Sequence, residues 1–401
     1  SENASINFTI DEKNNQGLLG KITAGYGTDD RYEASGLLNY FKGNRKISVL
    51  ASSNNINSSG FSMDGVFDNM GGGRSQFNSF GGRGSGGLGG GSGSGITKSN
   101  MVGFNYSDQF FEDLELNASY YLNDIRNENS NRSRIINLLP DGDFITESES
   151  NRISDNTNHS ANFNVEYEIS PTAKIFVEPK ISSANNIIDS QSSSSSMNEN
   201  GDLFNTSKSD TFSETDTFSF SNSIQFNKIL DKNGKNLSVA FNNSNVKTEG
   251  FGQTLSETLF YQGTQEDDQR NQKNDTRSTN DAYNFDVTYT QPIAKNFEIN
   301  LGYAFDYNLD TDILKTFDYD TLANEFSSLS EMYSSKTNNQ SIASTPYAGF
   351  TMNSEKINWQ VKSGVQINNF DANATYMKEN YTVNKRFISP SVSSNFRYKI
   401  D

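Results

Sequence analysis

Strict two-residue alternation is the sequence feature that most constrains how this chain can fold. From residue 297 to residue 307, apolar and aromatic side chains fill every odd position, and polar or small side chains fill every even one. Side chains of a β-strand alternate between its two faces, whereas a helix repeats every 3.6 residues. The run therefore predicts a strand with one apolar face. Its length suits a tilted strand that crosses a lipid bilayer, which needs roughly 9 to 11 residues.

The same alternation recurs along the chain. It is clear in the segments 114–122, 161–169, 283–289, 357–367 and 392–400, and we expect about fourteen such strands after residue 17. Strands of globular proteins usually have about 5 to 6 residues. The longer strands predict an all-β fold, an antiparallel up-and-down transmembrane β-barrel. A soluble sandwich and a secreted solenoid, whose strands also alternate, are the alternatives.

The alternation also predicts which side chains face lipid and which face the lumen of the barrel. In a transmembrane barrel, apolar side chains point outward and polar side chains inward. On the lipid side we expect Leu116, Tyr120, Phe163, Val165, Phe297, Leu301, Phe305, Val361 and Val365. On the lumen side we expect Glu166, Glu298, Asn300 and Lys362.

The connections between these strands are predicted to alternate in length. Short turns are expected at 42–45, 107–112, 170–173, 227–235, 291–296 and 353–356. Long polar loops are expected between them, at about 57–97, 126–155, 187–208, 249–277, 310–340 and 371–385. Transmembrane barrels have short periplasmic turns and long extracellular loops. We therefore expect all the long loops on one side of the membrane.

Composition agrees with a barrel and excludes several other classes. Only 33% of the residues are hydrophobic, yet the chain has 29 Phe and 18 Tyr, which disordered chains rarely contain. No run approaches the roughly 18 to 20 apolar residues that a spanning helix needs. The formal net charge of −16 disfavours nucleic-acid binding, which requires cationic side chains to neutralise phosphates.

Residues for catalysis or metal binding are scarce. The chain has no cysteine and a single histidine, His159, so neither a histidine-based triad nor a multi-histidine metal site can form. The Asp-x-Asp pairs lack the full spacing of a calcium loop, and we interpret them as solvated charges. We expect no enzyme activity, no catalytic residues, no cofactor and no metal.

A Gly-rich stretch at 71–95 is the one candidate for ligand capture. It does not fit a phosphate-binding loop, because a strand follows it where such a loop requires a helix. We expect a flexible surface loop. The residues in it that offer charge or stacking, and so are candidates for ligand binding, are Arg74, Phe77, Phe80 and Arg83.

Two segments near the start of the chain carry a family resemblance. Residues 4–13 resemble the closing strand of the plug domain in TonB-dependent receptors, and residues 20–28 resemble the first barrel strand of those receptors. The resemblance implies that 1–17 is the end of a plug domain. It also implies that 18–401 is part of a barrel of 22 strands. With about fourteen of those strands, the ring would be open, with its first and last strands unpaired.

The resemblance further implies a function. It points to an outer-membrane receptor that takes up a scarce or large ligand with energy from a TonB-type protein, which would contact the missing plug. The other expected partners are outer-membrane lipid, a surface lipoprotein and a ligand whose identity stays open, without nucleic acid. A passive porin or structural barrel is the first alternative, and a secreted β-rich adhesin is the second. The expected location is the outer membrane of a Gram-negative bacterium.

Overall fold

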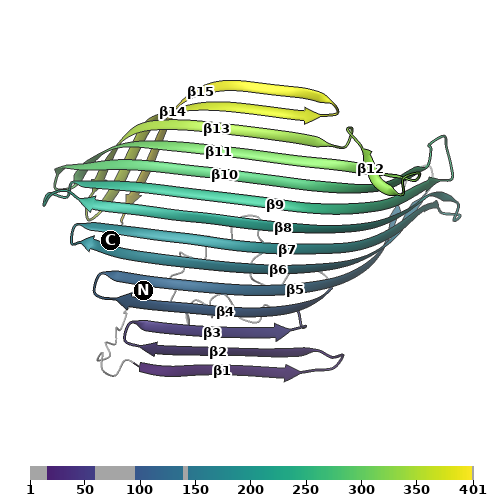
Figure 1. Ribbon diagram of the computed structural model, residues 1–401, viewed down its shortest axis with the longest axis horizontal. Coiled ribbons are helices and arrows are strands. Elements are labelled where there is room, and N and C mark those ends of the chain that lie inside the picture. Colours follow the sequence, from purple (N-terminus) through teal and green to yellow (C-terminus); the bar gives the residue numbers. More distant parts are fainter. Residues whose placement is uncertain (1–15, 59–94, 139–142, 400–401) are drawn as a thin grey trace.

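One antiparallel sheet makes up the fold in the computed structural model, which describes residues 16–58, 95–138 and 143–399. The strands lie side by side in a curved wall (Figure 1), and each neighbour on the main path is antiparallel to the next. Among these residues, no helix is long and apolar enough to cross a membrane. The all-β, up-and-down architecture predicted from the alternation is confirmed.

The sheet has fifteen strands, and fourteen of them follow one another in chain order. The remaining strand, β12, lies off this path and pairs only with β11. The expected number of about fourteen is therefore confirmed. The strands are β1 (Gln16–Tyr26), β2 (Tyr32–Lys42), β3 (Arg45–Asn54), β4 (Ile96–Phe110), β5 (Leu114–Asn137), β6 (Phe144–Ser170), β7 (Ala173–Asn198), β8 (Leu203–Ile229), β9 (Asn236–Phe260), β10 (Asp268–Ala294), β11 (Phe297–Asp320), β12 (Glu325–Leu329), β13 (Ser335–Asn353), β14 (Ile357–Tyr376) and β15 (Glu379–Tyr398).

The two outermost strands do not pair with each other within the described sheet. β1 pairs only with β2, and β15 pairs only with β14. Every residue of β15 is exposed. The wall is therefore open along these two edges (Figure 1), as expected.

Strand register assigns the side chains to two faces, because directly paired residues point to the same side of a sheet. One row of paired residues runs across seven strands and is entirely apolar: Leu116, Val165, Val177, Ile224, Phe241, Phe285 and Phe305. All the side chains expected to face lipid fall on the face of this row. Those expected to face the lumen fall on the opposite one. We call these the apolar face and the polar face.

The apolar face is apolar only near one end of the strands. β6 to β10 have 25 to 27 residues each, but the alternation covers only the part next to the connections 171–172, 230–235 and 295–296. We call this the short-turn end and the opposite one the hairpin end, which lies at the right of Figure 1. Toward the hairpin end, both faces are rich in Ser, Thr, Asn and charged residues.

The predicted loops at 126–155, 187–208, 249–277, 310–340 and 371–385 were largely wrong. Most of these residues belong to strands, and β9 and β10, for example, are paired from Thr258–Asp268 down to Asn236–Thr290. The backbone ladder needs no apolar side chains, so a strand can continue into water with both faces polar. Of the first expected loop, 57–97, residues 59–94 lie outside the described residues, and Ile96 and Thr97 begin β4.

At the short-turn end, the predicted turns lie where they were expected, but 107–112 and 291–296 were predicted too long, because β4 continues to Phe110 and β10 to Ala294. The longest of them, 230–235, is closed by Asp231, whose Oδ1 accepts bonds from the backbone N–H groups of Asn233 (2.9 Å) and Lys235 (3.1 Å). The Lys235 ammonium lies 3.3 Å from the same carboxylate. Desolvation, the largest single effect, would raise the pKa of Asp231. The backbone bonds and the Lys235 charge together hold that pKa below its ordinary value.

A small apolar core lies on the polar face of β2 to β5. Leu50, Met101 and Tyr121 are buried and pack together, and Leu37 joins them from β2. Gly103 lies between Leu50 and Tyr121 across the strands, and a Cβ there would come within 2.9 Å of Leu50. Several polar residues around this core are also buried: Ser48, Ser52, Asn54, Thr97, Ser99, Asn105 and Asn123.

Candidate functional site

The candidate residues of the Gly-rich stretch are not among those that the structure describes. Arg74, Phe77, Phe80 and Arg83 all lie outside the described residues, so their role in ligand capture stays a prediction. Two hollows in the described part of the chain offer other candidates. One lies on the polar face of β10, β11, β13 and β14, and the other at the hairpin end of β5 to β8.

The hollow on the polar face, which we call the lumen pocket, has a volume of about 590 Å³. Its strands also carry the apolar side chains Leu301, Phe350 and Val361 on their opposite face. The pocket therefore lies on the polar face, at the same height along the strands as the apolar part of the opposite face. Its lining residues are Asp286, Thr288, Glu298, Asn300, Tyr347, Gly349, Thr351, Gln360 and Lys362.

Tyr347 is the largest side chain of the lumen pocket and is held on all sides. It pairs with Gly302 on one side and Gly364 on the other. A Cβ at Gly302 would overlap the tyrosine ring, so the ring needs the space that this glycine leaves. The Tyr347 hydroxyl donates to Asp286 Oδ2 at 2.9 Å and lies 2.6 Å from Thr288 Oγ1. This network fixes the ring against the wall.

Asn300 forms a second fixed group in the lumen pocket. Its Oδ1 accepts a hydrogen bond from Thr290 Oγ1 at 2.8 Å, and its Nδ2 donates to Thr351 Oγ1 at 3.0 Å. Gly349 is its partner on β13. Because Gly349 has no side chain, the space above the sheet between Asn300 and Lys362 stays open.

The charged ends in the lumen pocket are less constrained. Lys362 Nζ lies 3.4 Å from the centroid of the Tyr347 ring, a cation–π contact that leaves its N–H groups able to donate. Glu298 and Gln360 receive no hydrogen bond or ion pair from any other residue in the described part of the chain. The pocket thus offers a carboxylate, an amide and an ammonium group to a ligand.

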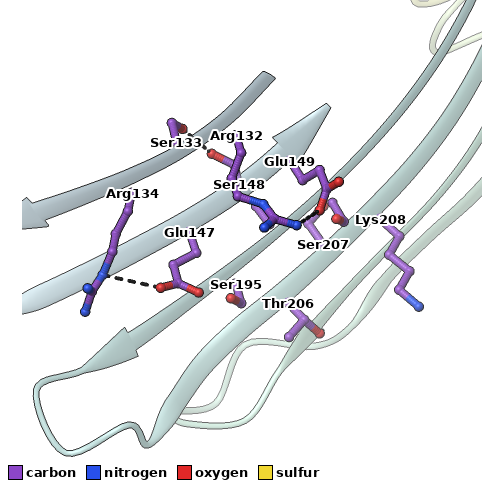
Figure 2. A pocket seen from close by; sticks show the side chains of 12 residues that line it. Arg132, Ser133, Arg134, Glu147, Ser148, Glu149, Ser195, Thr206, Ser207 and Lys208 are labelled. Carbon is purple, nitrogen blue, oxygen red and sulfur yellow. Dashed lines mark hydrogen bonds and ion pairs between the residues drawn. The ribbon is translucent and has the colours of Figure 1, made fainter. Parts of the chain in front are cut away.

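The second hollow, which we call the hairpin groove, has a volume of about 730 Å³. Two ion pairs cross from β5 to β6 between directly paired residues: Arg132 to Glu149 at 2.9 Å, and Arg134 to Glu147 at 3.3 Å. Figure 2 shows these pairs beside serine and threonine hydroxyls from β7 and β8. The hydrogen bond that Arg132 donates to Glu149 raises the pKa of the Arg132 guanidinium group. The groove presents hydroxyl groups, two ion pairs and the ammonium group of Lys208.

The sequence predicted the facing of several polar residues of the lumen pocket, but it did not predict that they share one pocket. Glu298, Asn300 and Lys362 were expected on the lumen side, but nothing in the sequence brings β10 and β14 to one hollow. The hairpin groove was missed because 126–155 and 187–208 were expected to be loops. Among the described residues, no group of three or more His, Cys, Asp or Glu side chains could hold a metal ion.

A family model agrees with the fold over part of the chain. Residues 228–401 match the model of the outer membrane protein beta-barrel family. No curated protein matches the chain. Among solved structures, the chain is similar to the FrpB iron transporter from Neisseria meningitidis. The F5-1 variant in its apoprotein form is 9% identical, with a TM-score of 0.17, and the F3-3 variant is 7% identical, with a TM-score of 0.20. In both cases, 95% of this chain and 81% of the other chain are covered.

The up-and-down antiparallel sheet and the family match define the class of protein. It is an outer-membrane β-barrel protein, located in the outer membrane of a Gram-negative bacterium. The match covers the end of β8 and all of β9 to β15, which includes every strand of the lumen pocket. In barrels of this class, the apolar face contacts lipid and the short turns face the periplasm.

Proposed function

We propose that the chain forms the wall of a TonB-dependent importer, which takes up a ligand too large or too scarce for passive diffusion. A plug in the lumen would contact a TonB-type protein of the inner membrane, and a surface lipoprotein would assist capture. The resemblance of residues 20–28 to the first barrel strand of such receptors supports this proposal. These residues include the end of β1 and the start of the turn that follows it.

The width of the wall supports a role in passage. Barrels of about eight strands have interiors that side chains fill, whereas barrels of about 16 to 18 strands leave an aqueous channel. Fourteen strands already lie side by side in the described sheet. Such a wall encloses enough space for a solute or for an inserted domain.

The packed patch on the polar face of β2 to β5 is the observation that carries the proposal. Leu50 and Asn54 are each 1% exposed there, and Ser52 Oγ and Asn105 Oδ1 are buried without a hydrogen-bond partner in the described chain. An open pore keeps its polar wall wet, and buried polar groups need partners. The tight packing of this patch supports an importer, whose plug would lie against the polar face, over a porin.

The alternatives differ in what supports them. The exposed Gln360 and Lys362 are compatible with a water-filled lumen on the side of β14, so a passive porin is the second candidate. A secreted adhesin disagrees with the family match to an outer-membrane protein.

Planar-bilayer conductance of the full-length protein separates the importer from the porin. We expect an importer to be silent in the native state and to conduct only after urea releases the plug, whereas a porin conducts at once. A matching test in cells measures whether growth that depends on the protein stops when the proton-motive force is collapsed. Steady native conductance, or growth without energy, would contradict the proposal.

A further inference from the structure

The lumen pocket combines opposite charges in one polar hollow, and this combination selects a class of ligand. Asp286 and Glu298 provide carboxylates, and Lys362 provides an ammonium group. We propose that the lumen pocket binds short zwitterionic peptides during uptake, with Glu298 facing the peptide ammonium and Lys362 facing its carboxylate. This inference rests on the proposed function, because the pocket lies on the polar face, which would line the lumen of the importer.

The absence of partners for Glu298 is the first argument. Asp286 already accepts bonds from the Tyr347 and Thr288 hydroxyls, whereas no other described residue satisfies Glu298 or Gln360. A polar group that loses water without gaining a partner is costly. A neutral ligand would leave both Glu298 and Lys362 unpaired, and a simple anion or cation would leave one of them unpaired. A zwitterion pairs with both.

The separation of the two charges is the second argument. Glu298 is on β11 and Lys362 on β14, two strands apart, and their register positions differ by two residues. Neighbouring strands are about 4.8 Å apart and each residue adds about 3.3 Å, so the two Cα atoms are about 12 Å apart. An extended peptide spans roughly 3.3 to 3.6 Å per residue. The spacing therefore suits a peptide of about three to four residues.

The shape of the pocket is the third argument. Gly349 leaves the space between the charges open, and the side chains of Asn300 and Thr351 line it with amide and hydroxyl groups that are fixed to each other. These groups and the Gln360 amide can bond to peptide N–H and C=O groups between the two ends. The packed side of the lumen is at β2 to β5, whereas Gln360 and Lys362 are exposed. A ligand in the lumen can therefore reach both of these side chains.

Calorimetric titration of the full-length protein in detergent micelles tests this assignment. The probes are tetraalanine, its N-acetylated form, its C-terminal amide and maltotetraose, an uncharged glycan of similar length. We expect tetraalanine to bind and each capped form to bind about tenfold more weakly, the size of one charged hydrogen bond. Maltotetraose should bind more weakly than either capped form.

Three variants assign the contacts. Glu298→Gln should abolish the penalty for N-acetylation, and Lys362→Met should abolish the penalty for amidation. The control is Glu166→Gln, which changes a carboxylate on the polar face of β6, outside the pocket, and should leave all four affinities unchanged. Heat-modifiable migration in gels verifies that each variant is folded.

Several outcomes would overturn the inference. The first is that tetraalanine does not bind, and the second is that maltotetraose binds as tightly as tetraalanine. The third is that the penalties for N-acetylation and amidation persist in Glu298→Gln and Lys362→Met. If Glu298→Gln or Lys362→Met opens native conductance and leaves peptide affinity unchanged, the pocket docks the plug instead. The proposed function fails separately: tetraalanine binding with the predicted penalties, in a protein that conducts without urea, would retain the peptide site and reject the energised importer.

Discussion

Replacing Leu301 with arginine tests whether the apolar face contacts lipid. Leu301 is on β11 and is 53% exposed, with no part of the described chain covering that side. It is four residues from Phe297, the first residue of its strand. At about 3.3 Å per residue and a tilt of about 40°, it lies roughly 10 Å into an apolar band about 25 Å tall. This places it close to the middle of the bilayer.

The depth determines the expected cost. Arginine on the lipid face of a barrel costs about 2 to 4 kcal/mol at the midplane and about 0 to 1 kcal/mol near the interfaces. We therefore expect Leu301→Arg to lower the free energy of unfolding by about 2 to 4 kcal/mol. The matched control is Gln360→Arg, on the polar face of β14, where the same charge stays in a polar lumen. Its cost should be within about 0.5 kcal/mol of zero.

Reversible unfolding in guanidinium from phospholipid vesicles measures both costs. The chain has one tryptophan, Trp359, which is on the apolar face of β14 and is exposed. Its fluorescence therefore reports loss of the lipid contact. Equal costs at Leu301 and Gln360, or a larger cost at Gln360, would refute the assignment of faces. If Leu301→Arg hardly changed the free energy of unfolding, the position of Leu301 near the middle of the bilayer would be refuted.

Three further predictions concern other parts of the wall. Gly302→Val should destabilise the protein by about 1 to 3 kcal/mol, because the added side chain overlaps the Tyr347 ring. The cost should be smaller in a Tyr347→Ala background. Equal costs in both backgrounds would show that the overlap with the ring is not the cause. The exposed pair Arg132–Glu149 should show coupling in a double-mutant cycle at low salt that disappears at high salt. The folded-state pKa of Asp231 is lowered, so its contribution to stability is present above the ordinary carboxyl pKa and lost as pH falls through the lowered value. Asp231→Asn should therefore lose less stability than the wild type between about pH 5 and pH 2, and a parallel decline of both proteins would contradict the prediction.

Alternation in the sequence was sufficient to predict the wall next to the short turns. Between Phe297 and Phe305, each apolar side chain needs lipid and each polar one needs water, so the two faces can be assigned without knowing the neighbouring strands. The same information is missing at the hairpin end. Residues 192–196 are all serine and have no preferred face, yet they pair with β6 and β8. The neighbouring strands determine their structure, and a single-sequence pattern cannot show this.

The site was harder to predict than the strands. The lumen pocket joins Asp286 on β10 to Lys362 on β14, and only the register across four strands brings them to one hollow. The role of glycine was also hidden. From the sequence, Gly302, Gly349 and Gly364 would only weaken their strands. In the structure, Gly302 and Gly364 make room for Tyr347. Gly349 leaves the lumen pocket open between Asn300 and Lys362. Predicting that arrangement requires knowing which residue is opposite each glycine.

The tall hairpins change the thermodynamics of capturing a ligand. Ordering the backbone of a flexible loop costs roughly 1 to 2 kcal/mol per residue, and a receptor with loose loops incurs that cost each time it binds. In this protein, β6 and β7 continue as paired strands to Phe144 and Asn198, so that entropy is already lost when the protein folds. A ligand that reaches the hairpin groove meets a surface of fixed shape. A few contacts are then enough for affinity. A substitution on one strand changes the side chains of the hairpin groove without rearranging its backbone.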